Sequence, residues 1–329
     1  GDFRGSLELW TELLKLNGMS KLAHNGYGKS LFSLGRYEEA MEEFEYTYNR
    51  TEYSNAWWEV RNIWITRYIG YAFAALAALA AALYACRLAA RRGRTRARPG
   101  LAAGAAAAEL ADGSPRGRGK FRLWKDVLYI GTVLRHPIDS LYDLKAGNHG
   151  SVASASVVYG IAYAVFLLNF LLRAFLFRGL NSYRYLSAGY LAGAFLLPCA
   201  LWVAANYLIS SISDGEGSLK NVYVCTAYAF SPMILLMPAA VALGYACTLN
   251  EGFIVELAGA IAIGWTVAYF LLMVSQVHDF GFVNMIKNVL LTVFAIVCAI
   301  AAFLVVYLMA KQVIAFAADV GREVMFRAS

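Results

Sequence analysis

The sequence predicts an all-α protein in which a helical solenoid fragment is followed by a polytopic helical membrane bundle of about six spans. Three observations predict this class: a repeat of 34 residues near the start of the chain, a content of 60% hydrophobic residues over 329 positions, and long segments without charge. Internal repeats of roughly 20 to 50 residues are typical of stacked structural units. A chain this apolar exceeds the usual composition of soluble domains and indicates insertion into a membrane.

The repeat lies in residues 1–66. Gly1 and Phe3 recur 34 positions later as Gly35 and Tyr37. Small residues where two helices would touch, with an aromatic residue four positions further on, resemble the tetratricopeptide family of helix pairs. The resemblance is carried by Gly28, Gly35, Tyr37, Ala40, Phe44 and Trp58. It implies a tetratricopeptide-type helical solenoid that presents a surface to a partner protein.

This interpretation assigns residues 6–16 to the second helix of one pair, 21–34 and 37–50 to a complete pair, and 54–66 to the start of a further pair. Because Gly1 stands at a turn position, we expect further repeats upstream of residue 1. The expected partner-binding surface consists of His24, Tyr27, Tyr37, Trp57 and Trp58.

Two positions depart from the repeat pattern. His24 stands where an aromatic residue is usual, and Thr47 stands where alanine is usual. An ordinary pair of amphipathic helices, with coincidental spacing, is the alternative interpretation of residues 1–66.

Six segments are long and apolar enough to cross a bilayer, which takes about 20 residues per helix. They are residues 68–86, 152–172, 186–211, 222–247, 253–274 and 289–310. The first is rich in alanine and the least hydrophobic, but the nearby Trp57, Trp58 and Trp64 support it, since such rings settle at the membrane interface. The predicted organisation is repeats in 1–66, the first span in 67–87, a linker in 88–120, an interfacial amphipathic segment in 121–150, a five-span bundle in 151–312 and an amphipathic tail in 313–329.

The basic residues predict the orientation of the chain in the membrane. Between Arg87 and Lys125 there are eleven Lys and Arg residues against two acids, a bias that places this segment in the cytoplasm. The repeats would then lie outside a bacterial plasma membrane, one span away. If the first span does not cross, the repeats stay on the cytoplasmic side, and that topology is the main alternative.

The linker at 88–120 is rich in Ala, Gly and Arg and lacks a helical apolar period, so we expect it to be disordered. Its arginines fit attraction to anionic lipid headgroups better than binding of nucleic acid, because no aromatic residues are interleaved with them. We therefore expect the lipid bilayer, and no nucleic acid, among the partners.

Enzyme motifs are missing from the sequence. It has no phosphate-binding loop, no GxSxG turn and no nucleotide fingerprint. None of the five cysteines forms a CxxC pair, which argues against a zinc site or a redox couple. We expect no enzymatic activity, no catalytic residues, no cofactor and no metal.

Three segments resemble the Yip family of integral membrane domains: HPIDSLYDLK, SDGEGSLKNVYVCTAYAFSPMILLMP and VSQVHDFGFVNMIKN. The resemblance covers about residues 121–310 and implies a five-span bundle. In eukaryotic relatives it implies contact with small GTPases and vesicle-trafficking proteins, but helical repeats ahead of the bundle are not part of that pattern. Some bacterial members resemble accessory membrane proteins that are encoded near carbohydrate importers of the ATP-binding-cassette type, which is an association only.

Three groups of residues in the membrane part are candidates for a role. The expected cytoplasmic loop motif consists of Asp214, Gly215, Glu216, Gly217, His278 and Asp279, and forms either a tight solvated turn or a binding loop for a partner or cation. Helix kinks are expected at Pro232 and Pro238. The polar residues in or beside spans are Arg173, Glu256, Asn169 and Asn206.

The expected roles of these polar residues are structural. Glu256 would pair with Arg173 or Arg178 near the outer surface, and the two asparagines would join helices by hydrogen bonds. The sequence thus predicts a membrane-anchored scaffold or accessory subunit that docks on another membrane complex, such as a transporter permease or a solute-binding protein, and that also forms homo-oligomers. An autonomous small-solute transporter or channel is the alternative.

Overall fold

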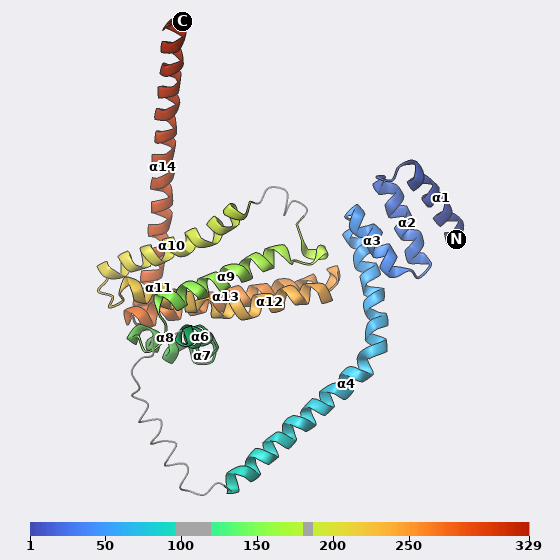
Figure 1. Ribbon diagram of the computed structural model, residues 1–329, viewed down its shortest axis with the longest axis horizontal. Coiled ribbons are helices and arrows are strands. Elements are labelled where there is room, and N and C mark those ends of the chain that lie inside the picture. The colour runs from blue at the N-terminus through green and yellow to red at the C-terminus, as the bar shows by residue number, and fades with distance from the viewer. Residues whose placement is uncertain (97–119, 180–186, 329) are drawn as a thin grey trace. The chain divides into compact units, whose positions relative to one another are not determined.

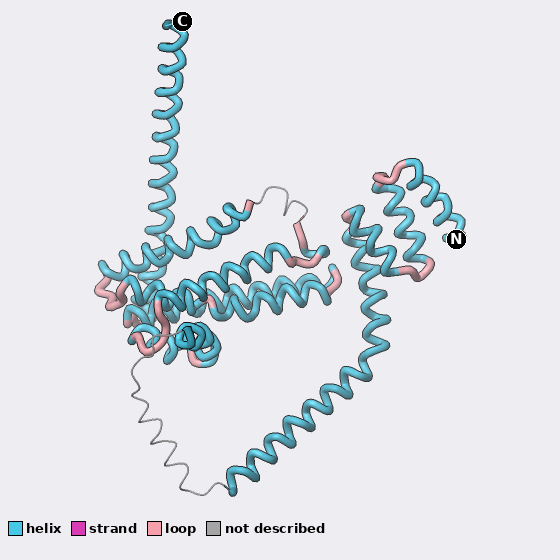
Figure 2. Tube along the Cα trace, viewed as in Figure 1, coloured by secondary structure: helices cyan, strands magenta, loops and turns pink. Residues whose placement is uncertain are grey.

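The computed structural model describes residues 1–96, 120–179 and 187–328. In these ranges the regular elements are helices, and no strand is present (Figures 1 and 2). The predicted all-α class is therefore confirmed. Most of the predicted basic linker lies outside the described residues.

The chain divides into two compact units. The N-terminal unit contains the described residues of 1–119 together with Arg173–Gly179 and Val241–Glu256. The bundle unit contains Lys120–Leu172, the described residues of 180–240, and those of 257–329. The two short stretches of the N-terminal unit that come from later in the sequence contain turns between membrane helices, and the second also includes the adjoining helix ends.

Successive packed helices build the N-terminal unit, with each helix contacting the next (Figure 1). They enclose a small core formed by Leu31, Ala40, Phe44 and Ala56. Its helices are α1 (Phe3–Leu16), α2 (Lys21–Ser33), α3 (Tyr37–Thr47) and α4 (Arg50–Arg96), and its later turns are the 3-10 helices η1 (Phe175–Phe177) and η2 (Leu249–Glu251).

Local chemistry explains where these helices begin and how closely they pack. Asp2 and Ser20 cap α1 and α2, because their side chains accept hydrogen bonds from backbone N–H groups three residues later. Gly35 turns the chain between α2 and α3 with a φ of +78°. Gly28 lets α3 approach, because a Cβ atom there would lie 2.8 Å from the Phe44 ring.

Helix α4 combines two predicted segments. It runs without a break from the helix expected at 54–66 through the first predicted span and on to Arg96, rather than ending at residue 87. Residues 88–96 of the expected linker are therefore helical. Since this segment contains no proline, no residue interrupts the helix between the packed turns and the apolar turns.

Six helical segments are long and apolar enough to cross a membrane, in the order that the sequence predicts. The fourth contains two helices, which meet at Phe230, just before Pro232. The segments are Arg50–Cys86, Val152–Leu171, Gly189–Ile212, Leu219–Ala246, Leu249–His278 and Phe282–Arg322.

Short helices precede the spans of the bundle unit. They are α6 (Lys120–Leu128), α7 (Ile130–Arg135) and α8 (Pro137–Ala146), and α8 begins at Pro137, whose ring favours the first position of a helix. The remaining helices are α9 (Val152–Leu171), α10 (Ala188–Ile212), α11 (Leu219–Ala229), α12 (Ser231–Ala246), α13 (Gly252–His278) and α14 (Phe282–Ala328).

Tyr228 on α11 lies at the centre of the bundle core and is fully buried. Its hydroxyl donates to the Asp126 carbonyl at 2.8 Å, and Ser154 Oγ lies 3.2 Å away. This one side chain connects α6, α9 and α11, so the short helices before the spans are part of the bundle.

Candidate functional site

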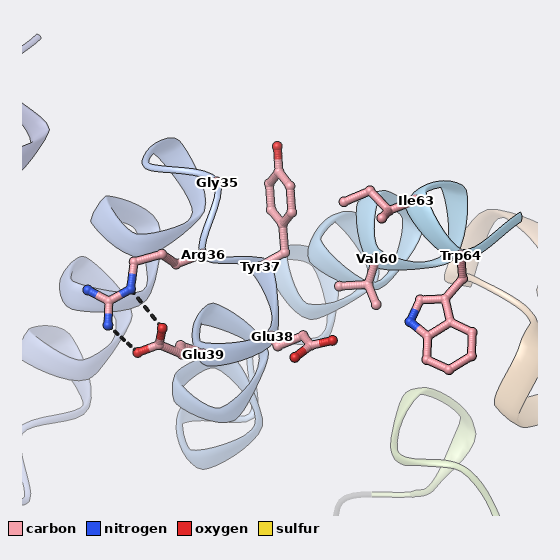
Figure 3. Close-up of a pocket in the computed structure, with 8 residues that line it drawn as sticks. All are labelled: Gly35, Arg36, Tyr37, Glu38, Glu39, Val60, Ile63 and Trp64. Atoms are coloured by element: carbon pink, nitrogen blue, oxygen red, sulfur yellow. Dashed lines mark hydrogen bonds and ion pairs between the residues drawn. The ribbon is translucent and has the colours of Figure 1, made fainter. Parts of the chain in front are cut away.

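A groove runs between α3 and α4 in the N-terminal unit. It consists of two adjoining pockets of about 250 and 480 Å³, which share Glu38, Val60 and Trp64. Figure 3 shows the first pocket, where Glu38 extends from α3 toward Val60 on α4. The first is lined by Gly35, Arg36, Tyr37, Glu38, Glu39, Val60, Ile63 and Trp64, and the second by Glu38, Met41, Glu42, Glu45, Tyr53, Trp57, Val60 and Trp64. We call this the α3/α4 groove.

One wall of the groove is acidic. Glu38, Glu42 and Glu45 follow one another on α3 at spacings of four and three, so they lie on one face of the helix. All three are exposed, and none forms an ion pair within the described residues. The neighbouring Glu39 differs, because it pairs with Arg36 (Figure 3). Within the described part of the chain, the wall therefore carries three carboxylates without a cationic partner.

The opposite wall is aromatic and apolar. Tyr53, Trp57, Val60 and Trp64 follow one another on α4 at spacings of four, three and four. Such a spacing keeps side chains on one helical face. At a rise of 1.5 Å per residue, the eleven steps from Tyr53 to Trp64 extend over about 16 Å. Trp64 is 58% exposed, Tyr53 and Trp57 are half-buried and Val60 is buried, so this face is most open to a binding partner at Trp64.

Helix α4 is held in place by the turns at the ends of later membrane helices in the same unit. Arg61 forms two hydrogen bonds with the Glu251 carboxylate, one of them 2.8 Å between Nη2 and Oε1. Ser54 Oγ accepts from the Leu249 N–H at 2.9 Å, and Arg50 donates to the Arg178 carbonyl. The aromatic wall is thus fixed to η2 and to the segment around η1.

Two of the five predicted partner-binding residues line the groove, namely Tyr37 and Trp57. Trp58 is exposed but lies outside the lining, and Tyr27 packs against the small core. His24 instead joins α2 to α3. Its Nδ1 lies 2.5 Å from Glu43 Oε2, and its Nε2 lies 3.0 Å from the Gly18 carbonyl.

The environment of His24 favours its protonated form. Burial lowers the pKa of the imidazole, but the hydrogen bonds to the Gly18 carbonyl and Glu43 and the negative charge of Glu43 together raise it above its usual 6.5. Both ring nitrogens face an acceptor, so both carry a proton in this arrangement. His24 is a structural cross-link between helices and is not available to a partner.

Sequence reasoning missed the three acids, Tyr53, Val60 and Trp64 as parts of this site. A signal for them exists, because acids at 38, 42 and 45 and large apolar residues at 53, 57, 60 and 64 each follow a helical period. These two sets of residues face each other only because α3 packs against α4. Neither pattern specifies this packing by itself.

The loop motif at 214–217 lies in the bundle unit, against His278. A Cβ atom on Gly217 would lie 2.7 Å from the His278 ring, and one on Gly215 would lie 3.0 Å from Nδ1 of that ring. Asp214 adopts a positive φ of 57°. These contacts support the interpretation as a tight turn, in which the glycines permit the close approach.

The acids of this region take part in an ion pair and in a turn. Glu216 pairs with Lys145 at 3.2 Å, and Asp279 takes a positive φ of 56° in the turn after α13. Within the described residues, no group of three His, Cys, Asp or Glu side chains is placed to hold a metal ion.

Asn206 joins three helices of the bundle unit. Its Oδ1 lies 3.0 Å from His278 Nε2, and its Nδ2 donates to Asn288 Oδ1 at 3.0 Å. Asn288 in turn donates to Ser210 Oγ at 3.0 Å. This buried network connects α10, α13 and α14, as expected for interhelical hydrogen bonds in a membrane protein. Asn169 is half-buried and makes no side-chain hydrogen bond within the described residues.

The predicted ion pair of Glu256 with Arg173 or Arg178 is not formed. Both Glu256 and Arg173 are exposed, and Glu256 takes part in no ion pair in the described chain. The acid that pairs with an arginine is Glu251, and its partner is Arg61. The position of Glu251 relative to the predicted span did not indicate this role. Of the two predicted kinks, the helix break at Phe230 precedes Pro232, whereas Pro238 lies inside α12 without ending it.

Fold and composition define a multi-pass, all-α membrane protein with a packed helical unit at its N-terminal end. Residues 131–308 match the family model of the Yip1 domain. This match covers more than half of the chain, so the protein belongs to the Yip1 domain family. No curated protein and no solved structure gives a significant match to it.

Proposed function

We propose that this protein is a membrane-anchored scaffold or accessory subunit that binds a partner protein through its N-terminal helical unit. The observation that carries the proposal is the α3/α4 groove, in which three acids that form no ion pair within the described residues face a partly exposed aromatic stripe. Exposed aromatic side chains in a depression are frequent anchors of protein interfaces. Helices α2 and α3 lie where the repeat pattern predicts a helix pair. This supports the tetratricopeptide interpretation, which implies a partner-binding surface on this unit.

A second surface supports lateral docking of the bundle to another membrane protein. Ser156, Gly160 and Ala164 are exposed at four-residue spacing on α9, and small residues at this spacing permit close helix packing in lipid. Beside them lies a largely apolar cavity of about 590 Å³. Its lining is Ser156, Tyr159, Gly160, Tyr163, Leu196, Cys199, Ala200, Val203, Ala204, Leu219 and Tyr223.

The proposed complex is a carbohydrate importer of the ATP-binding-cassette type, with a permease or a solute-binding protein as the direct partner. Only the resemblance to bacterial members of the family supports this finer statement. The proposed location is the plasma membrane, with the helical unit outside and the basic segment in the cytoplasm. The Arg61–Glu251 pair supports this topology, because it keeps the start of α4 beside the turn between α12 and α13. Three predicted spans separate this turn from the cytoplasmic basic segment, so the turn would also lie outside.

Affinity purification of the full chain from native membranes in mild detergent, followed by mass spectrometry, tests the proposal. We expect a stoichiometric companion protein. A variant that lacks residues 1–49 removes the acidic wall but keeps α4, and it should lose this companion while still reaching the membrane fraction. Recovery of the chain alone, together with solute flux in liposomes made from the purified protein, would contradict the proposal and favour an autonomous transporter.

A further inference from the structure

The chemistry of the α3/α4 groove specifies the kind of partner that fits it. We propose that the groove binds an amphipathic helix of a partner protein, with Lys or Arg residues beside its apolar face. This inference rests on the proposed function, in which the N-terminal unit binds proteins. It adds the secondary structure and the charge of the segment that is bound.

The shape of the groove favours a helix over a small ligand. Its apolar wall extends over about 16 Å, which equals three turns of an α-helix. A small cation or a lipid headgroup would contact only about one turn of this wall. An amphipathic helix presents anchors at i, i+4 and i+7, and the aromatic residues Tyr53, Trp57 and Trp64 are spread over a matching length.

The charge of the groove selects a basic segment. Two neighbouring acids, by contrast, have cationic partners in this chain: Glu39 pairs with Arg36, and Glu52 pairs with Lys29 at 3.2 Å. The three wall acids lack such partners in the described residues, and they project over two turns of α3. Like charges across an interface suppress binding, so an acidic segment or an anionic surface is rejected here.

The order of the helices supports the same occupant. In this unit, α2 packs on α1, α3 on α2, and α4 on α3. Helix α4 is the last member, because it continues as a membrane span instead of turning back to form a helix pair. A stacked unit needs a neighbour to cover its apolar face. A partner helix in the groove would lie where the second helix of that pair would otherwise pack.

The test uses the full chain in nanodiscs of zwitterionic phosphatidylcholine and a fluorescent synthetic peptide of about 14 residues, or four turns. The peptide carries Leu at i, i+4 and i+7 and Lys on both flanks, and its control carries Glu in place of Lys. Fluorescence anisotropy reports binding. We expect the Lys peptide to bind, the Glu peptide not to bind, and binding to weaken as salt concentration rises.

Two matched variants locate the binding. Glu38→Gln with Glu42→Gln should weaken binding of the Lys peptide by about fivefold or more. Glu8→Gln with Glu12→Gln removes the same charge at the same spacing from exposed positions on α1, and it should leave the affinity unchanged. Likewise, Trp64→Ala should weaken binding, whereas Trp58→Ala, outside the groove, should not.

Equal affinity of the two double variants, equal binding of the Glu peptide, or equal binding to nanodiscs without protein would overturn the inference. Its failure is distinguishable from failure of the proposed function. If the companion protein is lost with residues 1–49 but retained by the Glu38→Gln and Glu42→Gln variant, a partner binds this unit elsewhere, and only the groove assignment is wrong.

Discussion

The cross-link between α2 and α3 makes the stability of the N-terminal unit depend on pH. The His24 ring lies between the Glu43 carboxylate and the Gly18 carbonyl, and its side chain is only 17% exposed. The pKa of His24 is raised above its unfolded value of 6.5. The stabilisation is therefore fully present below pH 6.5 and is lost as the pH rises through the folded pKa.

The size of the effect follows from the two hydrogen bonds of the imidazolium. Bonds to charged groups contribute about 1.5–3 kcal/mol each in a protected site. Contact with solvent reduces the value for a pair such as this one toward that of surface ion pairs. We expect the free energy of opening of the α2–α3 hairpin to fall by about 1 kcal/mol between pH 5.5 and pH 8.5.

Amide hydrogen exchange of the full chain in detergent, corrected for the intrinsic effect of pH, measures this free energy for α2 and α3. His24→Gln should abolish the pH dependence, and Glu43→Gln should reduce it. A stability that rises with pH over this range, or an unchanged dependence in the His24 variant, would refute the reasoning.

Three further predictions concern two glycines in close contacts and one buried hydrogen-bond network. Gly28→Val should lower the free energy of unfolding of the N-terminal unit by about 1–3 kcal/mol, as followed by hydrogen exchange, because its Cβ meets the Phe44 ring at 2.8 Å. Gly217→Val should lower the Tm of the detergent-solubilised chain, because its Cβ meets the His278 ring at 2.7 Å. Asn206→Leu should destabilise the bundle by about 1–2 kcal/mol in denaturant unfolding, because it removes the centre of the buried network.

Two glycines provide controls for the valine substitutions. A Cβ atom on Gly70 in α4 or on Gly131 in α7 would meet no atom within 4 Å, so valine there should be neutral or slightly stabilising. Loss of stability equal to that of the Gly28 and Gly217 variants would show that the close contacts are not the cause. For Asn206, an unfolding curve that coincides with wild type would contradict a role of the network in stability.

The membrane spans could be predicted from the sequence because hydropathy is a local property. Each of the six segments is helical at the expected place, the fourth as two helices that meet at Phe230. The boundary between repeat helix and first span could not be predicted in the same way. Nothing in residues 50–96 stops a helix, so the change from a packed to an apolar surface occurs within α4.

The candidate site was only partly predictable, because its walls come from two helices and its support from distant turns. Trp57 and Tyr37 were found through the repeat pattern, but the acids at 38, 42 and 45 resemble an ordinary solvated helix face. The Arg61–Glu251 pair joins residues 190 positions apart. The sequence favours Glu256 as the acid of an ion pair, because it lies inside the predicted span. In the structure, packing instead brings Glu251 to Arg61.

The most direct test of the proposed partner site places a photo-crosslinking amino acid at position 64 of the full chain in native membranes, with position 58 as control. Both positions carry exposed tryptophans on α4, but only position 64 lines the groove. The account predicts that irradiation joins one companion polypeptide, identified by mass spectrometry, to position 64 and not to position 58. Equal adducts at both positions, or none at position 64, would contradict it.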